Sequence, residues 1–273
     1  MAEVVLKSAG ELSLMRESGR LLAAVFGYLD GQIEAGMSTM DINNLAEHYI
    51  VQQLKCRPAS KGQYGYQYVL NTSVNNVVCH GVPSRVQKLK PGDIVNVDIT
   101  LEHRGFIADS SKMYLIGVVS PLARRLVLTT YEAMWEGIRA VRPGATLGDV
   151  GHAVQRYAEM HGYSVVREYC GHGIGREMHE EPQVLHYGQR GKGLLLQEGM
   201  TFTIEPMINQ GKAKVKTKKD GWTVVTSDKR LSAQWEHTIA VTAGGYEVLT
   251  LRDEERADVT ELSRDNFGPN GCK

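Results

Sequence analysis

Apolar side chains recur at helical spacing around two matching stretches of the chain, residues 33–50 and 141–158. In each stretch an apolar run with a helical period ends at a glycine, a Ser or Thr follows, and an aspartate then opens a second helix. The residues in these roles are Gly36, Ser38 and Asp41 in the first stretch, and Gly144, Thr146 and Asp149 in the second. We expect each glycine to terminate a helix and each aspartate to cap the next one. The pattern therefore predicts two similar helix pairs.

Three other segments alternate between apolar and polar residues, which predicts strands with two different faces. They cover residues 94–101, 200–205 and 232–241. The apolar faces consist of Val95, Val97, Ile99 and Leu101; of Met200, Phe202 and Ile204; and of Trp235, Ile239 and Val241. Each opposite face carries one carboxylate, and these are Asp98, Glu205 and Glu236. Each strand should bury one face and present an acid on the other.

The chain repeats itself at a constant spacing. The two helical stretches are offset by 141 − 33 = 108 residues, and residues 92–98 and 199–205 by 199 − 92 = 107. We predict an α/β (α+β) fold: a single catalytic domain, residues 1–252, made of two related halves at about 10–120 and 121–250. Long helices should pack on one face of a curved, mainly antiparallel sheet. Residues 253–273 are polar and lack apolar periodicity, so we expect them to form a loose tail.

The composition narrows the range of functions. Lys+Arg and Asp+Glu both number 31 among 273 residues, with a pI near 7.1, which argues against bulk binding to nucleic acid or to a membrane surface. The four cysteines form no C-x-x-C pair, as expected of a reducing cytosol. The longest early apolar stretch, residues 21–29, is far shorter than the ~18 residues of a membrane span, and no small-residue cleavage site follows it. We expect a cytoplasmic protein.

The acids on the predicted strands are candidates for metal binding. A single acid on a strand most often forms a salt bridge or is solvated, but no array of Arg or Lys accompanies Asp98, Glu205 and Glu236. Carboxylates gathered in a cleft repel one another unless they are protonated or bind a metal. His172, between two glycines, and His179, seven residues later, add imidazoles that divalent cations accept. The H-E-x-x-H signature of other metal hydrolases is absent.

Six motifs resemble those of bacterial type I methionine aminopeptidases, and the resemblance covers about residues 5–252. The motifs are VCHGVP (78–83), IVNVDIT (94–100), DSSKM (109–113), REYCGHGIGREMHEEPQVLHY (167–187), GMTFTIEPM (199–207) and LSAQWEHTI (231–239). Each motif alone is moderate evidence, whereas together they are highly specific. The resemblance implies the pita-bread fold, whose two pseudo-symmetric halves agree with the internal repeat.

The resemblance also implies a cofactor and a reaction. Five residues match the metal ligands of the family: Asp98, Asp109, His172, Glu205 and Glu236. They would hold two divalent ions, for which Co²⁺, Mn²⁺, Fe²⁺ and Zn²⁺ all suit a nitrogen and oxygen ligand set. A hydroxide held between the metals would attack the first peptide bond. The implied activity is removal of the N-terminal methionine from nascent proteins whose second residue is small.

Further roles follow from the resemblance alone. Glu205 would pass a proton toward the leaving amine, His179 would contact the carbonyl oxygen, and His80 would contact the next peptide nitrogen. Tyr66 and Trp222 match aromatic residues of the methionine pocket. Other pocket positions depart from the family, because Gln63, Asn71 and Met178 stand where relatives often have Tyr, Cys and Phe. These departures leave the shape of the pocket open.

The sequence leaves open two alternative functions and one possible binding partner. An Xaa-Pro dipeptidase or creatinase-like enzyme would share the fold, and a binding module could keep the fold without its metals. The lysine-rich residues 212–230 predict a hairpin that turns at Asp220-Gly221. It is either a solvated edge or, as the resemblance suggests, a contact to the ribosome, where nascent chains emerge. We expect nascent N-termini as partners, a monomer, and neither a membrane nor a specific nucleic-acid sequence.

Overall fold

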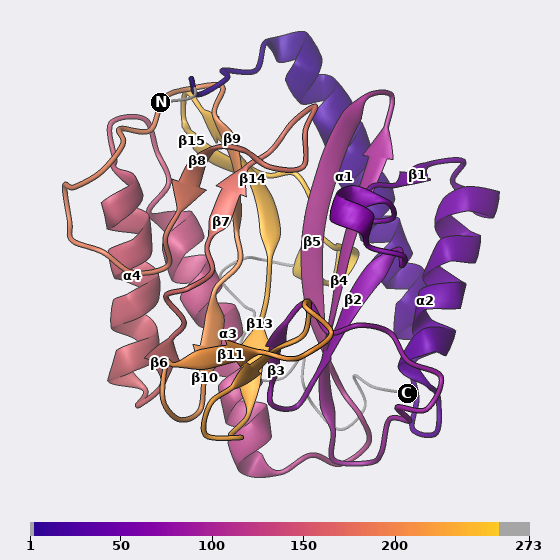
Figure 1. Ribbon diagram of the computed structural model, residues 1–273. Coiled ribbons are helices and arrows are strands. Elements are labelled where there is room, and N and C mark those ends of the chain that lie inside the picture. The colour runs from indigo at the N-terminus through magenta and orange to yellow at the C-terminus, as the bar shows by residue number, and fades with distance from the viewer. Residues whose placement is uncertain (1–2, 257–273) are drawn as a thin grey trace.

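The computed structural model describes residues 3–256 and places helices on two outer sides of a set of antiparallel strands (Figure 1). On one side lie α1 (Ala9–Asp30) and α2 (Thr39–His48), and on the other lie α3 (Pro121–Arg139) and α4 (Leu147–Met160). A π-helical turn, Tyr49–Gln53, continues α2, and 3₁₀ turns cover Gln63–Gly65 and Asp253–Glu255. In chain order the strands are β1 (Arg57–Pro58), β2 (Leu70–Val74), β3 (Val77–Cys79), β4 (Ile94–His103), β5 (Phe106–Leu115), β6 (Ser164–Val165), β7 (Gly171–Gly173), β8 (Glu180–Val184), β9 (Thr201–Ile204), β10 (Met207–Asn209), β11 (Val215–Thr217), β12 (Val224–Thr226), β13 (Ser232–Gln234), β14 (His237–Thr242) and β15 (Gly245–Val248).

The strands form four hydrogen-bonded groups rather than one continuous sheet. β4 pairs with β1, β2 and β5 in the first half, and the order β15-β14-β9-β7-β8 makes up the main sheet of the second half. Two smaller groups, β13-β10-β6 and β11-β12-β3, lie at one end of these. Every pair in these groups is antiparallel, so the predicted strand direction is confirmed.

The predicted apolar faces form the contacts between strands and helices. Val95, Val97, Ile99 and Leu101 of β4 pack in one core with Leu22 and Phe26 of α1 and Ile42 of α2. The matching apolar face of β9 and β14 packs in a second core with side chains of α3 and α4. Since each half buries its own helix pair against its own strands, the side chains on the opposite faces are free to line a shared site.

The second helix of each pair, α2 or α4, begins with the same capping arrangement, which differs from the predicted one. The caps are Ser38 and Thr146, and the aspartates occupy the third helical position. Asp41 accepts from the Ser38 backbone N–H at 2.7 Å and donates its own N–H to the Ser38 hydroxyl at 3.1 Å. Thr146 and Asp149 repeat this capping box at 2.8 and 3.2 Å. The aspartates therefore complete the cap instead of forming it.

The two glycines also differ from their predicted role. α1 ends at Asp30 and α3 at Arg139, several residues before Gly36 and Gly144. Both glycines have positive φ angles, +95° and +82°, in the loops that lead to α2 and α4. A side chain is disfavoured at such angles, so the apolar run continues past the helix end to a turn.

The predicted strand over residues 232–241 is divided in two. β13 pairs with β10, whereas β14 pairs with β9 in a different group. At the junction the Glu236 backbone instead pairs with Ser111 of β5, by N–H···O contacts of 3.3 and 3.4 Å. The chain thus changes partners at Glu236, and this is where the two halves meet.

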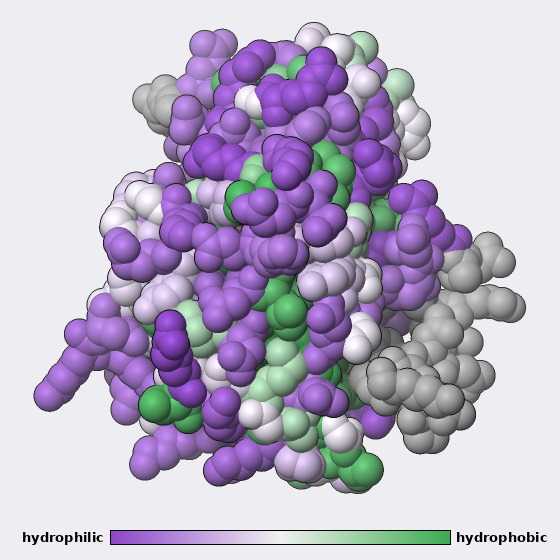
Figure 2. Space-filling model, turned by 90° about the vertical axis from the view of Figure 1, so that its right-hand side faces the viewer, coloured by the Kyte–Doolittle hydropathy of each residue, from purple (hydrophilic) through white to green (hydrophobic). Residues whose placement is uncertain are grey.

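The segment expected to form the tail begins with an ordered turn. Residues 253–255 form a 3₁₀ turn and the Glu255 side chain is buried, while the rest of the predicted tail, 257–273, lies outside the described residues. Between residues 3 and 256 no helix is long and apolar enough to cross a bilayer. Figure 2 shows that the side of the molecule where α2 lies is mostly hydrophilic with scattered apolar groups.

Candidate metal centre

A cavity of about 760 Å³ opens where the two halves meet. All nine residues predicted for the site line it: His80, Asp98 and Asp109 from the first half, Tyr66 at the wall, and His172, His179, Glu205, Trp222 and Glu236 from the second half. The fold therefore brings these nine residues together in one cavity.

Four carboxylates reach the cavity floor from three directions. Asp98 lies on β4 and Asp109 on the adjacent β5, where Thr100 is the direct partner of Asp109. Glu205 lies just past the end of β9, and Glu236 lies at the break between β13 and β14. Both carboxylates of the second half therefore reach those of the first half.

His172 on β7 completes the group. Its Nε2 lies 3.8 Å from Asp109 Oδ2 and 3.5 Å from Glu205 Oε1, and one ligand atom each from Asp109, His172 and Glu236 lie within 4.8 Å of one another. The flanking glycines are needed for sheet packing: a Cβ on Gly171 would lie 2.3 Å from Thr203 O and one on Gly173 would lie 2.1 Å from Glu181 O. Close strand approach, more than freedom of the imidazole, explains the Gly-His-Gly motif.

The protonation of His172 fits a cation. Its Nδ1 lies 3.0 Å from the Gly173 carbonyl oxygen, which assigns the ring proton to Nδ1 because a carbonyl only accepts. Burial lowers the pKa of His172 to about 4, so the ring is neutral at pH 7. The Nε2 lone pair therefore faces carboxylate oxygens, and a bound cation would remove the resulting repulsion.

The carboxylates lack the partners that would make them ordinary buried acids. Within residues 3–256 none of the four forms an ion pair with Lys or Arg. Burial raises the pKa of Asp98 to about 6 and that of Glu205 to about 8. Burial and then the neighbouring carboxylates raise the pKa values of Asp109 and Glu236 well above their usual range. Oxygen ligands, an imidazole and no protein counter-charge suit a divalent cation.

Short polar side chains orient the carboxylates. The Thr100 hydroxyl donates to Asp109 Oδ1 at 3.0 Å, and the Thr203 hydroxyl donates to Glu205 Oε1 at 2.7 Å. The Gln234 amide lies 3.4 Å from Glu205 Oε2. All three residues fall on the polar faces of the predicted strands, where the sequence alone gives them no role. The one sequence signal for a role near the site was that each of them lies two residues from a carboxylate, on the same face of a predicted strand.

Two further histidines stand above the floor. His179 is exposed at the cavity mouth, with its ring centroid 4.4 Å from that of His172. His80 is half-buried and has a φ of +54°, which is uncommon for a residue with a side chain. The next residue, Gly81, is packed so tightly that a Cβ would lie 2.0 Å from Thr72 O. This close approach accounts for the Cys79-His80-Gly81 sequence and turns the His80 ring toward the site.

The cavity wall is aromatic and apolar on one side. The Tyr66 and Trp222 rings lie 4.9 Å apart, and Trp222 extends from the tip of the β11–β12 hairpin. The three departures from the family pattern, Gln63, Asn71 and Met178, line the same cavity. Asn71 is also the cross-strand partner of Asp98, and its amide lies 3.3 Å from Asp98 Oδ2.

Tyr64 is a wall residue that sequence reasoning missed. Its hydroxyl lies 3.5 Å from His179 Nδ1 and its ring stacks on the imidazole at 6.0 Å. The only signal in the sequence was the tyrosine-rich segment 64–68, which gave no indication of which ring reaches the site.

Known proteins resemble this chain in sequence and structure. Residues 13–243 match the model of metallopeptidase family M24. A methionine aminopeptidase of Escherichia coli is 46% identical over 252 residues, which cover 92% of this chain and 96% of the relative. The crystal structure of a methionine aminopeptidase from Rickettsia prowazekii, 46% identical, covers 91% of this chain and all of its own, with a TM-score of 0.89.

A more distant likeness concerns the fold alone. A prolidase from Pyrococcus horikoshii superposes with a TM-score of 0.71 at 20% identity, and the match covers 64% of that chain. The family model and the likeness to these solved structures together establish the pita-bread architecture. The chain therefore belongs to metallopeptidase family M24, a family of hydrolases that use divalent metal ions.

Proposed function

We propose that this protein is a methionine aminopeptidase that removes the first residue of nascent chains when the second residue is small. The observation that carries the proposal is the convergence of four carboxylates and His172 beneath an aromatic wall in one cavity. The high identity to methionine aminopeptidases over nearly the whole chain supports the same reaction.

Asp98, Asp109, His172, Glu205 and Glu236 would hold two divalent ions. The bound ions would supply a nucleophile at neutral pH and stabilise negative charge on the scissile carbonyl group. Because the donor set is nitrogen and oxygen only, Co²⁺, Mn²⁺, Fe²⁺ and Zn²⁺ are all acceptable. The Thr100 and Thr203 hydroxyls hold two of the carboxylates in place at 3.0 and 2.7 Å.

The protein groups around the ions have separate tasks. Glu205 Oε2, which lies 3.4 Å from the Gln234 amide nitrogen, would accept a proton and pass it to the leaving amine. His179 would donate an N–H to the carbonyl oxygen as its charge develops. Burial lowers the pKa values of His80 and His179, so both are neutral donors at pH 7.

The aromatic wall would receive the methionine side chain. Tyr66 is buried and Trp222 is half-buried, and their rings, inclined at 57° to each other, present an apolar surface suited to a flexible thioether. His80, in its constrained backbone conformation, would crowd the position of the second residue. Small residues such as Ala, Ser and Gly should fit there, and Lys or Phe should not.

Peptide hydrolysis tests the proposal and separates it from the prolidase alternative. Purified protein should cleave Met-Ala-Ser and leave Met-Lys-Ser and Ala-Pro intact. Strong chelation should abolish turnover, and a divalent ion should restore it. Full activity in excess chelator, or a preference for Ala-Pro, would contradict the assignment. The metal content of the purified protein should be measured in parallel, because a binding module without metals would show neither metal nor turnover.

We propose a ribosome contact through the lysine-rich hairpin, residues 212–230, as the way this enzyme meets nascent chains in the cytoplasm as a monomer. The predicted hairpin is present, with β11 paired to β12 and Asp220 accepting from Trp222 N–H at the turn. Its basic side chains are exposed: Lys212, Lys214, Lys216, Lys218, Lys219, Lys229 and Arg230. Since Trp222 at the same tip lines the cavity, a phosphate-binding hairpin would bring the cavity close to an emerging chain.

A further inference from the structure

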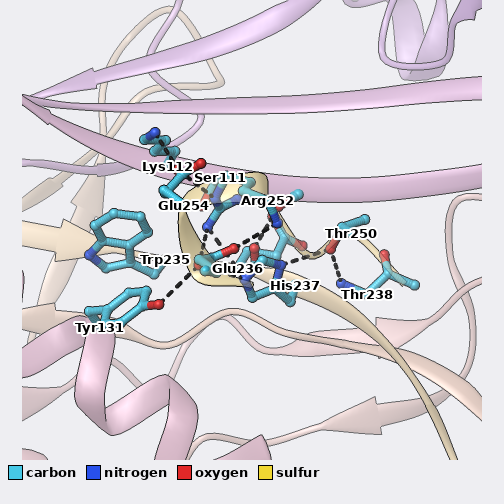
Figure 3. Close-up of polar contacts among 12 residues, drawn as sticks. Ser111, Lys112, Tyr131, Trp235, Glu236, His237, Thr238, Thr250, Arg252 and Glu254 are labelled. Carbon is cyan, nitrogen blue, oxygen red and sulfur yellow. Dashed lines mark hydrogen bonds and ion pairs between the residues drawn. The ribbon is translucent and has the colours of Figure 1, made fainter. Parts of the chain in front are cut away.

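The segment after β15 returns to the interior directly behind the metal centre. Thr250, Arg252 and Glu255 are all buried, with at most 2% of each residue exposed. Figure 3 shows Arg252 beside Trp235 and Glu236, with Thr250 beside His237 and Thr238. Polar residues this deeply buried are rare unless paired, and nothing in the proposed reaction uses them.

An ion pair with several partners anchors this segment. Glu255 Oε1 receives the Tyr131 hydroxyl at 3.1 Å and the His237 Nε2 at 3.1 Å, and it lies 3.3 Å from Arg252 Nη2. The second carboxylate oxygen accepts the Arg252 backbone N–H at 2.9 Å. A buried ion pair often contributes little net stability because desolvation offsets the attraction. The consequence of this ion pair that matters for the site is that it fixes the position of the Arg252 side chain.

Arg252 is linked to one candidate ligand through a hydroxyl. Its Nη1 donates to Ser110 Oγ at 2.9 Å, and Ser110 Oγ donates to the Glu236 carbonyl oxygen at 2.6 Å. Ser110 is fully buried and adjoins Asp109 in β5. The guanidinium therefore braces the backbone at the point where Glu236 changes strand partners.

Thr250 is linked to the other candidate ligand through the backbone and the hydroxyl of Thr238. The Thr250 hydroxyl accepts the Thr238 backbone N–H at 3.1 Å. The Thr238 hydroxyl in turn donates to the Asp109 carbonyl oxygen at 2.8 Å and accepts the Asp109 N–H at 3.1 Å. The Ser110 and Thr238 hydroxyls thus connect β5 to Glu236 and to β14. Arg252 and Thr250, in the segment after β15, each form a hydrogen bond to one of these two bridging residues.

We propose that Thr250, Arg252 and Glu255 form a C-terminal latch that positions Asp109 and Glu236 for metal binding. The latch is needed because these two acids come from different halves, so their mutual repulsion tends to separate β5 from β14. The inference rests on the proposed function, since it assumes that the two carboxylates hold the ions. The latch residues are positioning residues and take no part in the reaction itself.

Ser110→Ala is the sharpest test, because it breaks the link from Arg252 to Glu236 and leaves the buried ion pair intact. The matched control is Ser18→Ala, since Ser18 is equally buried and donates to the carbonyl oxygen of Phe106, the first residue of β5, at 3.0 Å. The dissociation constant for Mn²⁺ is measured by calorimetry on chelator-stripped full-length protein, after circular dichroism has established that each variant is folded.

We expect Ser110→Ala to weaken Mn²⁺ binding roughly 10- to 100-fold, as the loss of groups that orient metal ligands usually does, and Ser18→Ala to bind as the wild type does. Excess Mn²⁺ should restore turnover in Ser110→Ala. If Ser110→Ala does not fold, Thr250→Val breaks the second link and should give the same weakening. Wild-type affinity in the folded variant would overturn the latch and leave the proposed function standing. Failure of the wild type to bind Mn²⁺ would overturn both.

Discussion

Glu205 joins the two tasks of the site, because it is both a candidate ligand and the group placed to carry a proton. Glu205→Gln keeps the size of the side chain and an oxygen for the Thr203 hydroxyl, yet it removes the negative charge. We expect kcat for Met-Ala-Ser to fall by at least the order of 10²–10⁴ that loss of an acid–base group costs. Glu168→Gln changes an exposed glutamate lining the same cavity and should leave kcat unchanged. Equal activity in the two variants would refute the role of Glu205.

His179 is expected to contribute by stabilising charge in the transition state rather than by carrying a proton. An N–H donated to the carbonyl oxygen strengthens only as charge develops there, so His179→Ala should lower kcat far more than it raises KM. The expected loss is on the order of 10²–10³ in kcat. Tyr64→Phe removes only the hydroxyl that lies 3.5 Å from His179 Nδ1 and should have a smaller effect in the same direction. An unchanged kcat in His179→Ala would mean that this histidine only packs at the cavity mouth.

At the scale of single elements, the β11–β12 hairpin allows recruitment to be separated from catalysis. Changing Lys214, Lys216, Lys218 and Lys219 to Glu should abolish co-sedimentation with ribosomes, and wild-type binding should weaken steeply with added salt. Hydrolysis of free Met-Ala-Ser should barely change. The same total charge is reversed in a control variant with Lys55, Lys90, Arg190 and Lys192 changed to Glu, all of which are exposed elsewhere. Ribosome binding that survives the hairpin variant but not the control would rule out the hairpin contact.

The strands were predictable because alternation depends only on local sequence. The apolar faces of β4, β9 and β14 pack where the pattern indicates, and the carboxylates on or beside them reach one cavity. The break at Glu236 was not predictable, since both pieces alternate correctly and only their partners differ. The hydroxyl contacts to Asp109 and Glu205 likewise depend on register, which a single sequence does not specify.

The C-terminal latch shows a second limit of sequence reasoning. The polar residues 252–256 resemble a solvated tail, yet Arg252 and Glu255 are buried because partners from β5, β14 and α3 satisfy them. Those partners are more than a hundred residues away along the chain, except for His237. Burial of charged groups is decided by such distant contacts, whereas burial of apolar residues follows from their own periodicity.

For the whole molecule, the site concentrates charge where the two halves meet, and the stability of the metal-free protein should reflect this. The pKa of Glu205 is raised to about 8, and those of Asp109 and Glu236 are raised well above their usual range. These carboxyls keep their protons in the fold but lose them on unfolding. Unfolding therefore releases protons, so the free energy of unfolding should fall as pH rises. The histidines oppose this trend only below about pH 6.5, the ordinary pKa of imidazole, because burial lowers the pKa values of His172 and His186 to about 4 and about 3.

From pH 7 to pH 8.5 the buried histidines are neutral both folded and unfolded, which leaves the carboxyls and, toward pH 8.5, the thiols of Cys56, Cys79 and Cys170, whose pKa values burial raises. In chelator, the Tm of the wild type should decrease across this window, because the buried carboxyls hold protons that unfolding releases. In saturating Mn²⁺ the decrease should be smaller, because the cation compensates the charge, and the gap between the two Tm values should widen with pH. Glu205→Gln should make the chelator curve shallower, since it removes one of the carboxyl protons released on unfolding, whereas Glu168→Gln should retain the wild-type slope. A chelator Tm that stays constant from pH 7 to 8.5 would show that the four carboxylates are less crowded in solution than their burial and proximity indicate.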